Sequence, residues 1–210
     1  KRILGLNIAD SIPTNKISSV KMGTTVATNA LLERKGDRTL LLITEGFGDL
    51  LRIGYQNRPL LFDLEIKLPE LLYERVIEIP ERLDSDGKVI KKLDTQKARK
   101  ALKEAKQDGI DSVAIAFMHS YVNSEHENKI AEIAREENFN QISISHKVSP
   151  LIKLVGRGDT TVVDAYLSPI LRRYVNQVSE ELKDSKSTKL MFMQSNGGLT
   201  DAHLFQGKDA

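Results

Sequence analysis

Short, uninterrupted apolar runs alternate along this chain with longer segments that have the periodicity of amphipathic helices. The clearest runs are TLLLIT at residues 39–44, SVAIAFM at 112–118 and KLMFM at 189–193. A run without polar alternation is typical of a strand buried on both faces, as in a parallel sheet covered by helices. Strands that alternate with helices imply βαβ units. The sequence therefore predicts an α/β fold with a mostly parallel sheet and helices on both of its faces.

Capping residues, glycines and a proline mark the ends of the expected helices. Thr24 or Thr25 precedes a helical segment at residues 26–35, and Gly36 follows it. Ser124 and Glu127 have the spacing of a capping box, which predicts a helix start. Other helices are expected at residues 47–53, 94–107 and 160–183, the last interrupted at Ser168-Pro169 because proline lacks a backbone donor. Other strands are expected at residues 17–22 and 141–145.

The stretch between residues 55 and 92 departs from this alternation. Prolines and charged residues at 55–72 predict an irregular, exposed excursion. Residues 73–83 and 88–92 are predicted to pair as a β-hairpin, because Asp86-Gly87 is a strong turn signal. This hairpin is expected to be the one antiparallel addition to the parallel sheet.

Composition limits the classes of function. The 31 basic and 29 acidic residues leave a net charge of +2, and only 5% of the residues are aromatic, which argues against a nucleic-acid surface. The chain has no cysteine, so disulfides and thiolate sites are excluded. No apolar run approaches the ~20 residues of a membrane span. We expect no membrane or nucleic-acid partner and a cytoplasmic location.

Three glycine-containing segments are candidate anion-binding turns. Gly23-Thr24-Thr25 joins a strand to a helix, where hydroxyls and free backbone donors can hold a phosphate or carboxylate. Ser195-Asn196-Gly197-Gly198 follows a strand and can line a pocket at its carboxyl end. Gly156-Arg157-Gly158-Asp159 combines a cation with a helix start. Each segment has a plainer interpretation, respectively a helix cap, an ordinary turn and a surface turn with Asp159 as a cap.

Metal and catalytic residues are not indicated. The four histidines, His119, His126, His146 and His203, are scattered and lack metal-ligand spacing, so no metal site is predicted. No side chain stands out as a nucleophile or general base, and the catalytic residues stay unassigned.

A series of motifs extends over roughly residues 15–205 and resembles the hydantoinase A/5-oxoprolinase family in composition and order. The first motif is MGTTVATNALLERKG at residues 22–36. The others are TEGFGD at 44–49, QNRP at 56–59, PERLD at 80–84, FMHSY at 117–121, VSP at 148–150, TTVVDAYLSP at 160–169 and MQSNGG at 193–198.

This resemblance implies a ribonuclease-H-like ATPase fold of the actin, sugar-kinase and Hsp70 type. Members of the family use ATP and Mg²⁺ to phosphorylate the carbonyl oxygen of a cyclic amide, such as 5-oxoproline or a hydantoin, before water opens the ring. A hydantoinase B-type subunit or a fused domain commonly takes part, and a homo-oligomer is possible. Two alternatives stay open: a subunit of an ATP-dependent ketone carboxylase, or a catalytically silent module for packing and partner contact.

The resemblance also implies a division of the chain and an incomplete nucleotide site. Residues 1–187 correspond to the middle and end of the N-terminal hydantoinase/oxoprolinase domain, and residues 188–210 to the start of the hydantoinase A domain. The family's phosphate loops have no counterpart in the sequence. We therefore expect an internal, inactive piece of the ATPase subunit with no ATP or Mg²⁺ bound to it.

Six residues are carried over from the matching motifs as candidates for binding substrate or phosphate. They are Thr24, Thr25 and Asn29 in the first motif, with Ser195, Asn196 and Gly197 in the last. Their expected role is to orient the ligand through hydroxyl, amide and backbone donors.

Overall fold

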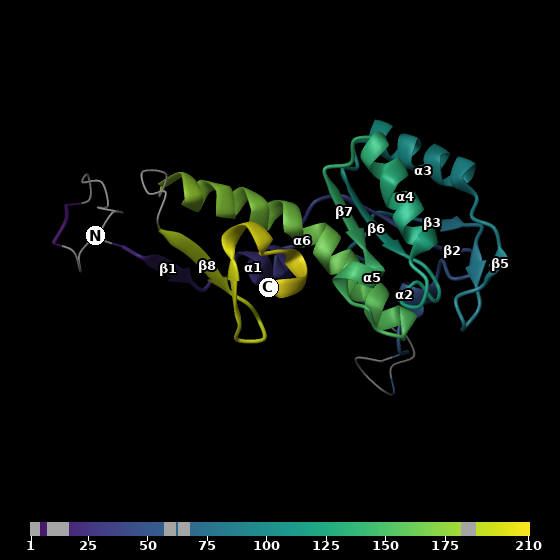
Figure 1. The fold of residues 1–210 in the computed structure, drawn as a ribbon, viewed down its shortest axis with the longest axis horizontal. Coiled ribbons are helices and arrows are strands. Elements are labelled where there is room, and N and C mark those ends of the chain that lie inside the picture. The colour runs from purple at the N-terminus through teal and green to yellow at the C-terminus, as the bar shows by residue number, and fades with distance from the viewer. Residues whose placement is uncertain (1–4, 8–16, 57–61, 63–67, 182–187) are drawn as a thin grey trace.

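The computed structural model describes residues 5–7, 17–56, 62, 68–181 and 188–210. Its strands form a four-stranded and a three-stranded sheet, which are joined by a long helix, and a separate two-stranded hairpin (Figure 1). The larger sheet consists of β2 (Thr39–Thr44), β3 (Arg75–Ile79), β6 (Ser112–Ala116) and β7 (Gln141–Ile144). Its order is β3-β2-β6-β7, and every pair is parallel. The predicted α/β class with a mostly parallel sheet is confirmed.

Both faces of the larger sheet are buried, as the continuous apolar runs predict. The helices are α1 (Val26–Leu32), α2 (Leu50–Ile53), α3 (Thr95–Gln107), α4 (Glu125–Glu136), α5 (Ser145–Val148) and α6 (Leu154–Glu181). Leu40 and Leu42 of β2 point into one core with α3 and α4. Leu41 and Ile43 point into the opposite core with α2 and the first half of α6. The period-two alternation of a strand thus supplies two cores from one apolar run.

The smaller sheet contains β1 (Ser19–Met22), β8 (Lys189–Met193) and β9 (Leu199–Asp201). β1 and β8 are parallel, although more than 160 positions separate them, and β9 is antiparallel to β8. Phe192 is the one fully buried residue of β8, whereas Met193 is 54% exposed. The expectation of a strand buried on both faces was wrong for β8, because α1, α6 and two short 3₁₀ turns, Ala202–Leu204 and Gly207–Asp209, cover a single core around Phe192.

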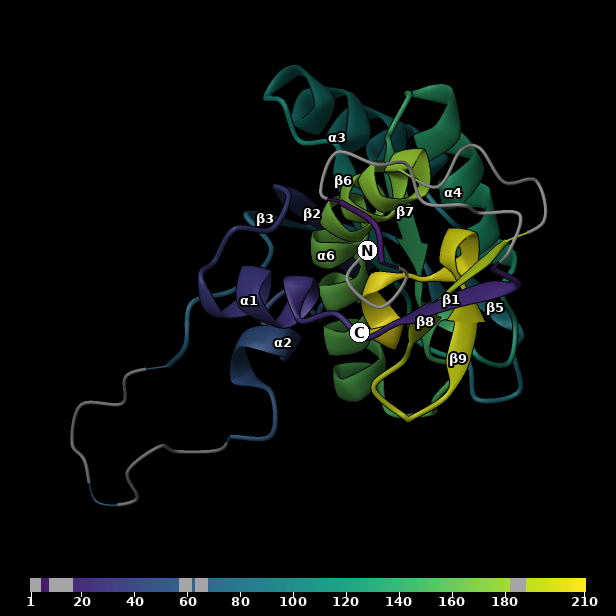
Figure 2. The same ribbon diagram turned by 90° about the vertical axis from the view of Figure 1, so that its left-hand side faces the viewer.

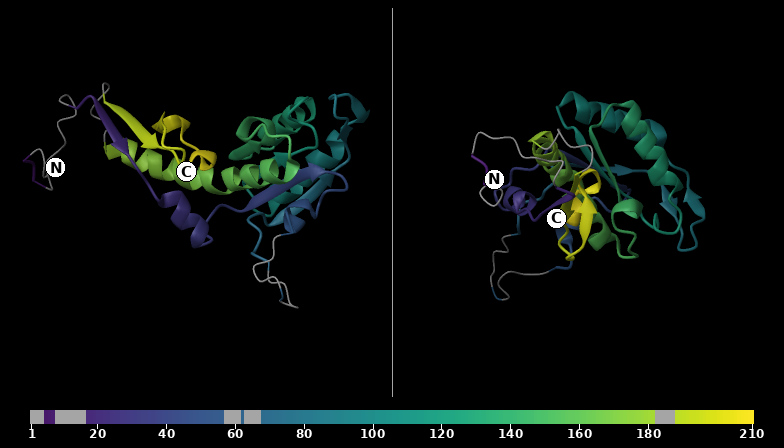
Figure 3. Two further views of the ribbon diagram at one scale, coloured as in Figure 1. Left: turned by 90° about the horizontal axis from the view of Figure 1, so that it is seen from below. Right: turned by 60° about the vertical axis from the view of Figure 1, so that its left-hand side comes forward.

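Helix α6 connects the two sheets (Figure 3). It begins six residues before the predicted start at residue 160, and it continues through Pro169 where an interruption was expected. Loss of one backbone donor costs about 3 kcal/mol in a helix interior. Burial offsets this cost here, since Leu167 and Leu171 on either side of the proline are 3% and 0% exposed. The predicted end at residue 183 lies outside the described residues.

The predicted hairpin is shorter than expected. Its strands are β4 (Arg82–Leu83) and β5 (Val89–Lys91), joined by the predicted turn, in which Gly87 has φ +80°. The segment Arg75–Ile79 was wrongly placed in the hairpin. It pairs instead with β2 as the parallel edge strand of the larger sheet.

Gly36 does not end α1 as predicted. The helix stops at Leu32, and the left-handed backbone conformation falls on Arg34, with φ +55°. A Cβ atom added to Gly36 would instead fall inside the ring of Tyr166 on α6. Glycine is therefore required there for the close approach of two segments rather than for a helix cap.

Among the described residues, no helix has the length and apolar character needed to cross a bilayer.

Candidate functional site

The two strongest sequence candidates lie at one edge of the smaller sheet. Parallel pairing aligns Met22 at the end of β1 with Phe192 near the end of β8. The chain therefore leaves both strands on the same side, through Gly23-Thr24-Thr25 and through Ser195-Asn196 (Figure 2). Ligands of open α/β sheets bind beyond the carboxyl ends of neighbouring parallel strands. The topology thus brings together two motifs that are far apart in the sequence.

Three of the six candidate residues have side chains free to meet a ligand. Thr25, Asn29 and Ser195 are exposed, and their side chains form no hydrogen bond to any described residue. The Asn29 amide donates to the Thr25 carbonyl at 2.8 Å across the first turn of α1. Residues four apart lie on the same helix face, so Thr25 and Asn29 present a hydroxyl and a carboxamide together.

The other three candidates hold the turns in shape. The Thr24 hydroxyl accepts a hydrogen bond from the Val26 amide at 3.2 Å. The Asn196 carboxamide oxygen accepts from the Gly198 amide at 2.8 Å, and Gly197 has φ +85°. Ser195-Asn196-Gly197-Gly198 is thus the tight turn of the β8–β9 hairpin, as the plainer interpretation expected.

The chemistry of this strand-end site is that of hydrogen-bond donors. Its six residues contribute hydroxyls, carboxamides and backbone amides, and none of them is an acid, a base or a cation. Such donors suit phosphate oxygens, and they provide no general base. Within the described part of the chain, no group of three or more His, Asp or Glu side chains converges as a metal site.

The third candidate turn does not exist. Gly156-Arg157-Gly158-Asp159 lies inside the first turns of α6, so Asp159 does not cap a helix. Both glycines face α2: a Cβ on Gly158 would lie 2.9 Å from a methyl group of Leu51, and one on Gly156 would lie 3.4 Å from the Tyr55 hydroxyl. The glycines allow close packing of two helices. The proposed anion grip at this turn was therefore wrong.

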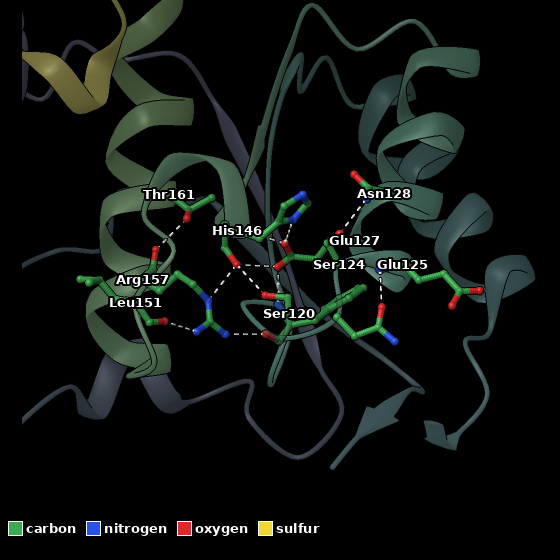
Figure 4. Close-up of polar contacts among 12 residues, drawn as sticks. Ser120, Ser124, Glu125, Glu127, Asn128, His146, Leu151, Arg157 and Thr161 are labelled. Atoms are coloured by element: carbon green, nitrogen blue, oxygen red, sulfur yellow. Dashed lines mark hydrogen bonds and ion pairs between the residues drawn. The ribbon is translucent and has the colours of Figure 1, made fainter. Parts of the chain in front are cut away.

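Arg157 is instead a fully buried structural cation (Figure 4). Its guanidinium donates to the Phe117 carbonyl at 2.6 Å and to the Leu151 carbonyl at 2.5 Å. A third donor reaches the Ser145 hydroxyl at 2.9 Å, and the ring of Tyr121 lies 5.4 Å from the guanidinium carbon. Burial lowers the pKa of the Arg157 guanidinium, while the nearby charge of Glu127 raises it.

Glu127 completes this network and does not form the predicted capping box. Its fully buried carboxylate accepts four hydrogen bonds: from the Phe117 amide, the Ser145 hydroxyl, and both the amide and Nδ1 of His146. A carboxylate has about four acceptor positions, and all are used here. Asn123, not Ser124, bonds the first amide of α4. The capping prediction failed because the sequence pattern does not show that Glu127 faces a core.

A second buried pair lies under the hairpin. Nδ1 of His126 is 2.7 Å from one carboxylate oxygen of Glu81, and the Thr44 hydroxyl donates to the other oxygen. The Thr44 oxygen in turn accepts from the Met118 amide at 2.8 Å. The buried pairings of Glu81, His126, Glu127 and Arg157 were not predicted, because their partners lie in other elements, between 5 and 45 positions away along the chain.

Comparison with known proteins identifies the class. The model of the hydantoinase/oxoprolinase N-terminal region matches residues 1–138, and the hydantoinase/oxoprolinase model matches residues 157–210. The chain belongs to the hydantoinase/oxoprolinase family.

Several characterised relatives are similar over nearly the whole chain. It is 40% identical to the 5-oxoprolinase of Saccharomyces cerevisiae over 220 residues, which is 92% of this chain and 17% of that protein. It is 41% identical to 5-oxoprolinase 1 of Arabidopsis thaliana, and the match covers 95% of this chain and 17% of that protein. Caprolactamase subunit alpha of Pseudomonas jessenii is 35% identical over 84% of the chain. The chain thus spans about a sixth of the length of the 5-oxoprolinases it matches.

Solved structures agree in fold. The ATP-dependent caprolactamase of Pseudomonas jessenii superposes with a TM-score of 0.80 at 30% identity, covering 95% of this chain and 30% of that one. The nucleotide-free structure of acetone carboxylase also gives 0.80, at 20% identity and 99% coverage. The second likeness supports the fold alone. Both are consistent with the predicted nucleotide-binding ATPase-like fold.

Proposed function

We propose that this chain is part of the ATPase component of an ATP-dependent cyclic-amide hydrolase. The relatives named 5-oxoprolinase and caprolactamase support this substrate class. The observation on which the proposal depends is the strand-end site, where Thr25, Asn29 and Ser195 offer free donors beyond two paired parallel strands. We propose that these three residues bind phosphate oxygens or orient the substrate.

The proposed reaction has three steps. The carbonyl oxygen of the cyclic amide attacks the terminal phosphorus of ATP, and ADP leaves. Water then adds to the activated carbon, and the ring C–N bond breaks as the nitrogen takes up a proton, which leaves an acyl phosphate. A second water attacks the same carbon, and inorganic phosphate departs with the former carbonyl oxygen. Donors preorganised around the transferred group lower the barrier by stabilising charge that develops on oxygen.

The cofactors and partner are part of the same proposal. The exposed donors fit the phosphates of ATP, and Mg²⁺ would accompany those phosphates, with no residue of this chain assigned to it. We propose a second subunit or fused domain for ring opening, as the designation "subunit alpha" of the caprolactamase relative suggests. A cytoplasmic location follows from the use of ATP.

Isotope transfer tests this function. The full-length protein is incubated with ATP, Mg²⁺ and 5-oxoproline or ε-caprolactam labelled with ¹⁸O in the carbonyl group. One labelled oxygen in phosphate for each ring opened is the expected result. Unlabelled phosphate would exclude this route, in which the phosphate carries away the former carbonyl oxygen. A ketone carboxylase would instead release phosphate only with a ketone and bicarbonate, and neither lactam would stimulate ATP consumption.

A further inference from the structure

A cavity of about 350 Å³ lies between α2, the first half of α6 and residues 68–73. Its walls are mainly apolar, with Leu51 from α2, Leu72 from the connecting segment, and Val162 and Val163 from α6. Small-molecule sites have about 300–1,000 Å³, apolar walls and a few placed polar groups. The size and lining of this cavity therefore suit a compact, mostly apolar ligand.

Tyr73 supplies an unused polar group to the cavity. Its side chain is 7% exposed, and its hydroxyl forms no hydrogen bond to a described residue. Across the described residues, Ser112 Oγ is the only fully buried side-chain polar atom without a partner. The Tyr73 hydroxyl consequently opens into the cavity. Burial raises the pKa of this hydroxyl, so at neutral pH it is a hydrogen-bond donor.

Asp159, which is exposed, supplies an acceptor on the α6 side of the cavity. It lies on the same face of α6 as Val162 and Val163, because residues three and four apart share a helix face. Its carboxylate forms no hydrogen bond or ion pair with a described residue, and burial raises its pKa. Asp159 and Tyr73 are close enough for the charge of the carboxylate to act on the phenol.

The remaining charged groups stand at the mouth of the cavity. Arg52 donates to the Pro69 carbonyl at 2.9 Å, which holds the connecting segment against α2. Glu70 is exposed at the rim. The cavity thus offers one buried neutral donor and one exposed acceptor beside apolar walls, while its cation, Arg52, is engaged by the Pro69 carbonyl.

We infer that this cavity binds the ring of a cyclic amide, with Tyr73 donating to the ring carbonyl and Asp159 accepting from the ring N–H. The inference rests on the proposed function, which supplies the lactam class. A lactam carries one acceptor and one donor on an apolar ring, which is the complement of this lining. A ligand that leaves the buried Tyr73 hydroxyl unpaired loses affinity.

The cavity also borders the core that packs around α1. Leu72 lines the cavity and packs as well against the core that includes Ala27 and Ala30 of α1. Helix α1 begins directly after Thr25. A ring held in the cavity is therefore next to the helix whose first turn presents the proposed phosphate donors.

Direct binding to the full-length protein tests the inference. Dissociation constants of 5-oxoproline and ε-caprolactam are measured by calorimetry with a non-hydrolysable ATP analogue present. Tyr73→Phe removes one neutral hydrogen bond and is expected to weaken binding by about 2- to 10-fold. Asp159→Asn removes a charged acceptor and is expected to weaken it by about 10-fold or more. Tyr174→Phe and Asp86→Asn, which make the same changes outside the cavity, are the matched controls and leave both constants unchanged.

The outcomes separate the two proposals. If the wild type binds and opens a lactam and the cavity variants bind it as tightly, the cavity assignment is overturned and the proposed function stands. A wild-type protein that neither binds nor opens a lactam would overturn both. The far-ultraviolet circular dichroism spectrum, recorded for every variant, shows that the protein is folded, and it is expected to match that of the wild type.

Discussion

Replacing Arg157 by methionine tests whether the buried network at the carboxyl edge of the larger sheet stabilises the fold. Methionine retains most of the side-chain volume and removes every donor of the guanidinium. The change leaves the buried carbonyl of Phe117 and the carboxylate of Glu127 without their cation. Removing one partner of a buried charged network costs about 3–5 kcal/mol. In a chain of this size the loss lowers the melting temperature by roughly 6–20 °C.

Arg173→Met is the matched control. Arg173 belongs to the same helix, and among the described residues its one ion pair is with Asp37 at 2.8 Å. The Arg173 side chain is 64% exposed. Exposed ion pairs contribute about 0.2–1 kcal/mol. Urea unfolding followed by circular dichroism measures both free energies. Equal losses of unfolding free energy in the two variants would refute the reasoning. They would mean that the buried hydrogen bonds of Arg157 stabilise the fold no more than an exposed ion pair does.

Three further changes are predicted. Gly36→Ala places a methyl group against the ring of Tyr166 and should lower the free energy of unfolding by about 1–3 kcal/mol. In the control, Gly23→Ala, the added methyl group meets open space, so the urea midpoint of Gly36→Ala is expected to be the lower of the two. Asp94→Ala removes the cap of α3 and should cost about 1 kcal/mol, and an unchanged melting curve would show that the cap is dispensable. Burial raises the pKa of Asp159, so the wild type loses stability as pH rises above about 4; Asp159→Asn should be more stable than the wild type at pH 7 but not at pH 3.

Local sequence patterns were sufficient for the fold class and for most of the strands and helices, but not for α5 and β9. The runs at Thr39–Thr44 and Lys189–Met193 are strands with the predicted bounds, because an apolar run of that length has few alternatives. The spacing could not show that Arg75–Ile79 pairs with β2 rather than with the hairpin. β2 has two edges: β6 pairs with one of them, and Arg75–Ile79 pairs with the other. Which edge a strand occupies depends on the assembled fold and not on local spacing.

The candidate site was predicted in its parts but not in its arrangement. The residue types of Gly23-Thr24-Thr25 and Ser195-Asn196 indicated anion-binding turns, while their adjacency depends on the pairing of β1 with β8. The interpretation of Glu127 failed for a related reason. Its spacing from Ser124 is that of an exposed cap, and only the contact of α4 with α5 makes it an interior acceptor.

The difference between satisfied and unsatisfied polar groups distinguishes scaffold from site in this chain. Glu127 and Arg157 are fully buried, and every charged oxygen or nitrogen between them has a protein partner, so they have no capacity left for a ligand. Tyr73 and Asp159 are placed around a cavity with no protein partner, and the raised pKa of Asp159 indicates that its charge costs stability. An uncompensated carboxylate lowers the stability of the free protein, and a ligand that donates to it recovers that loss. Binding of a lactam should therefore raise the melting temperature of the wild type more than that of Asp159→Asn.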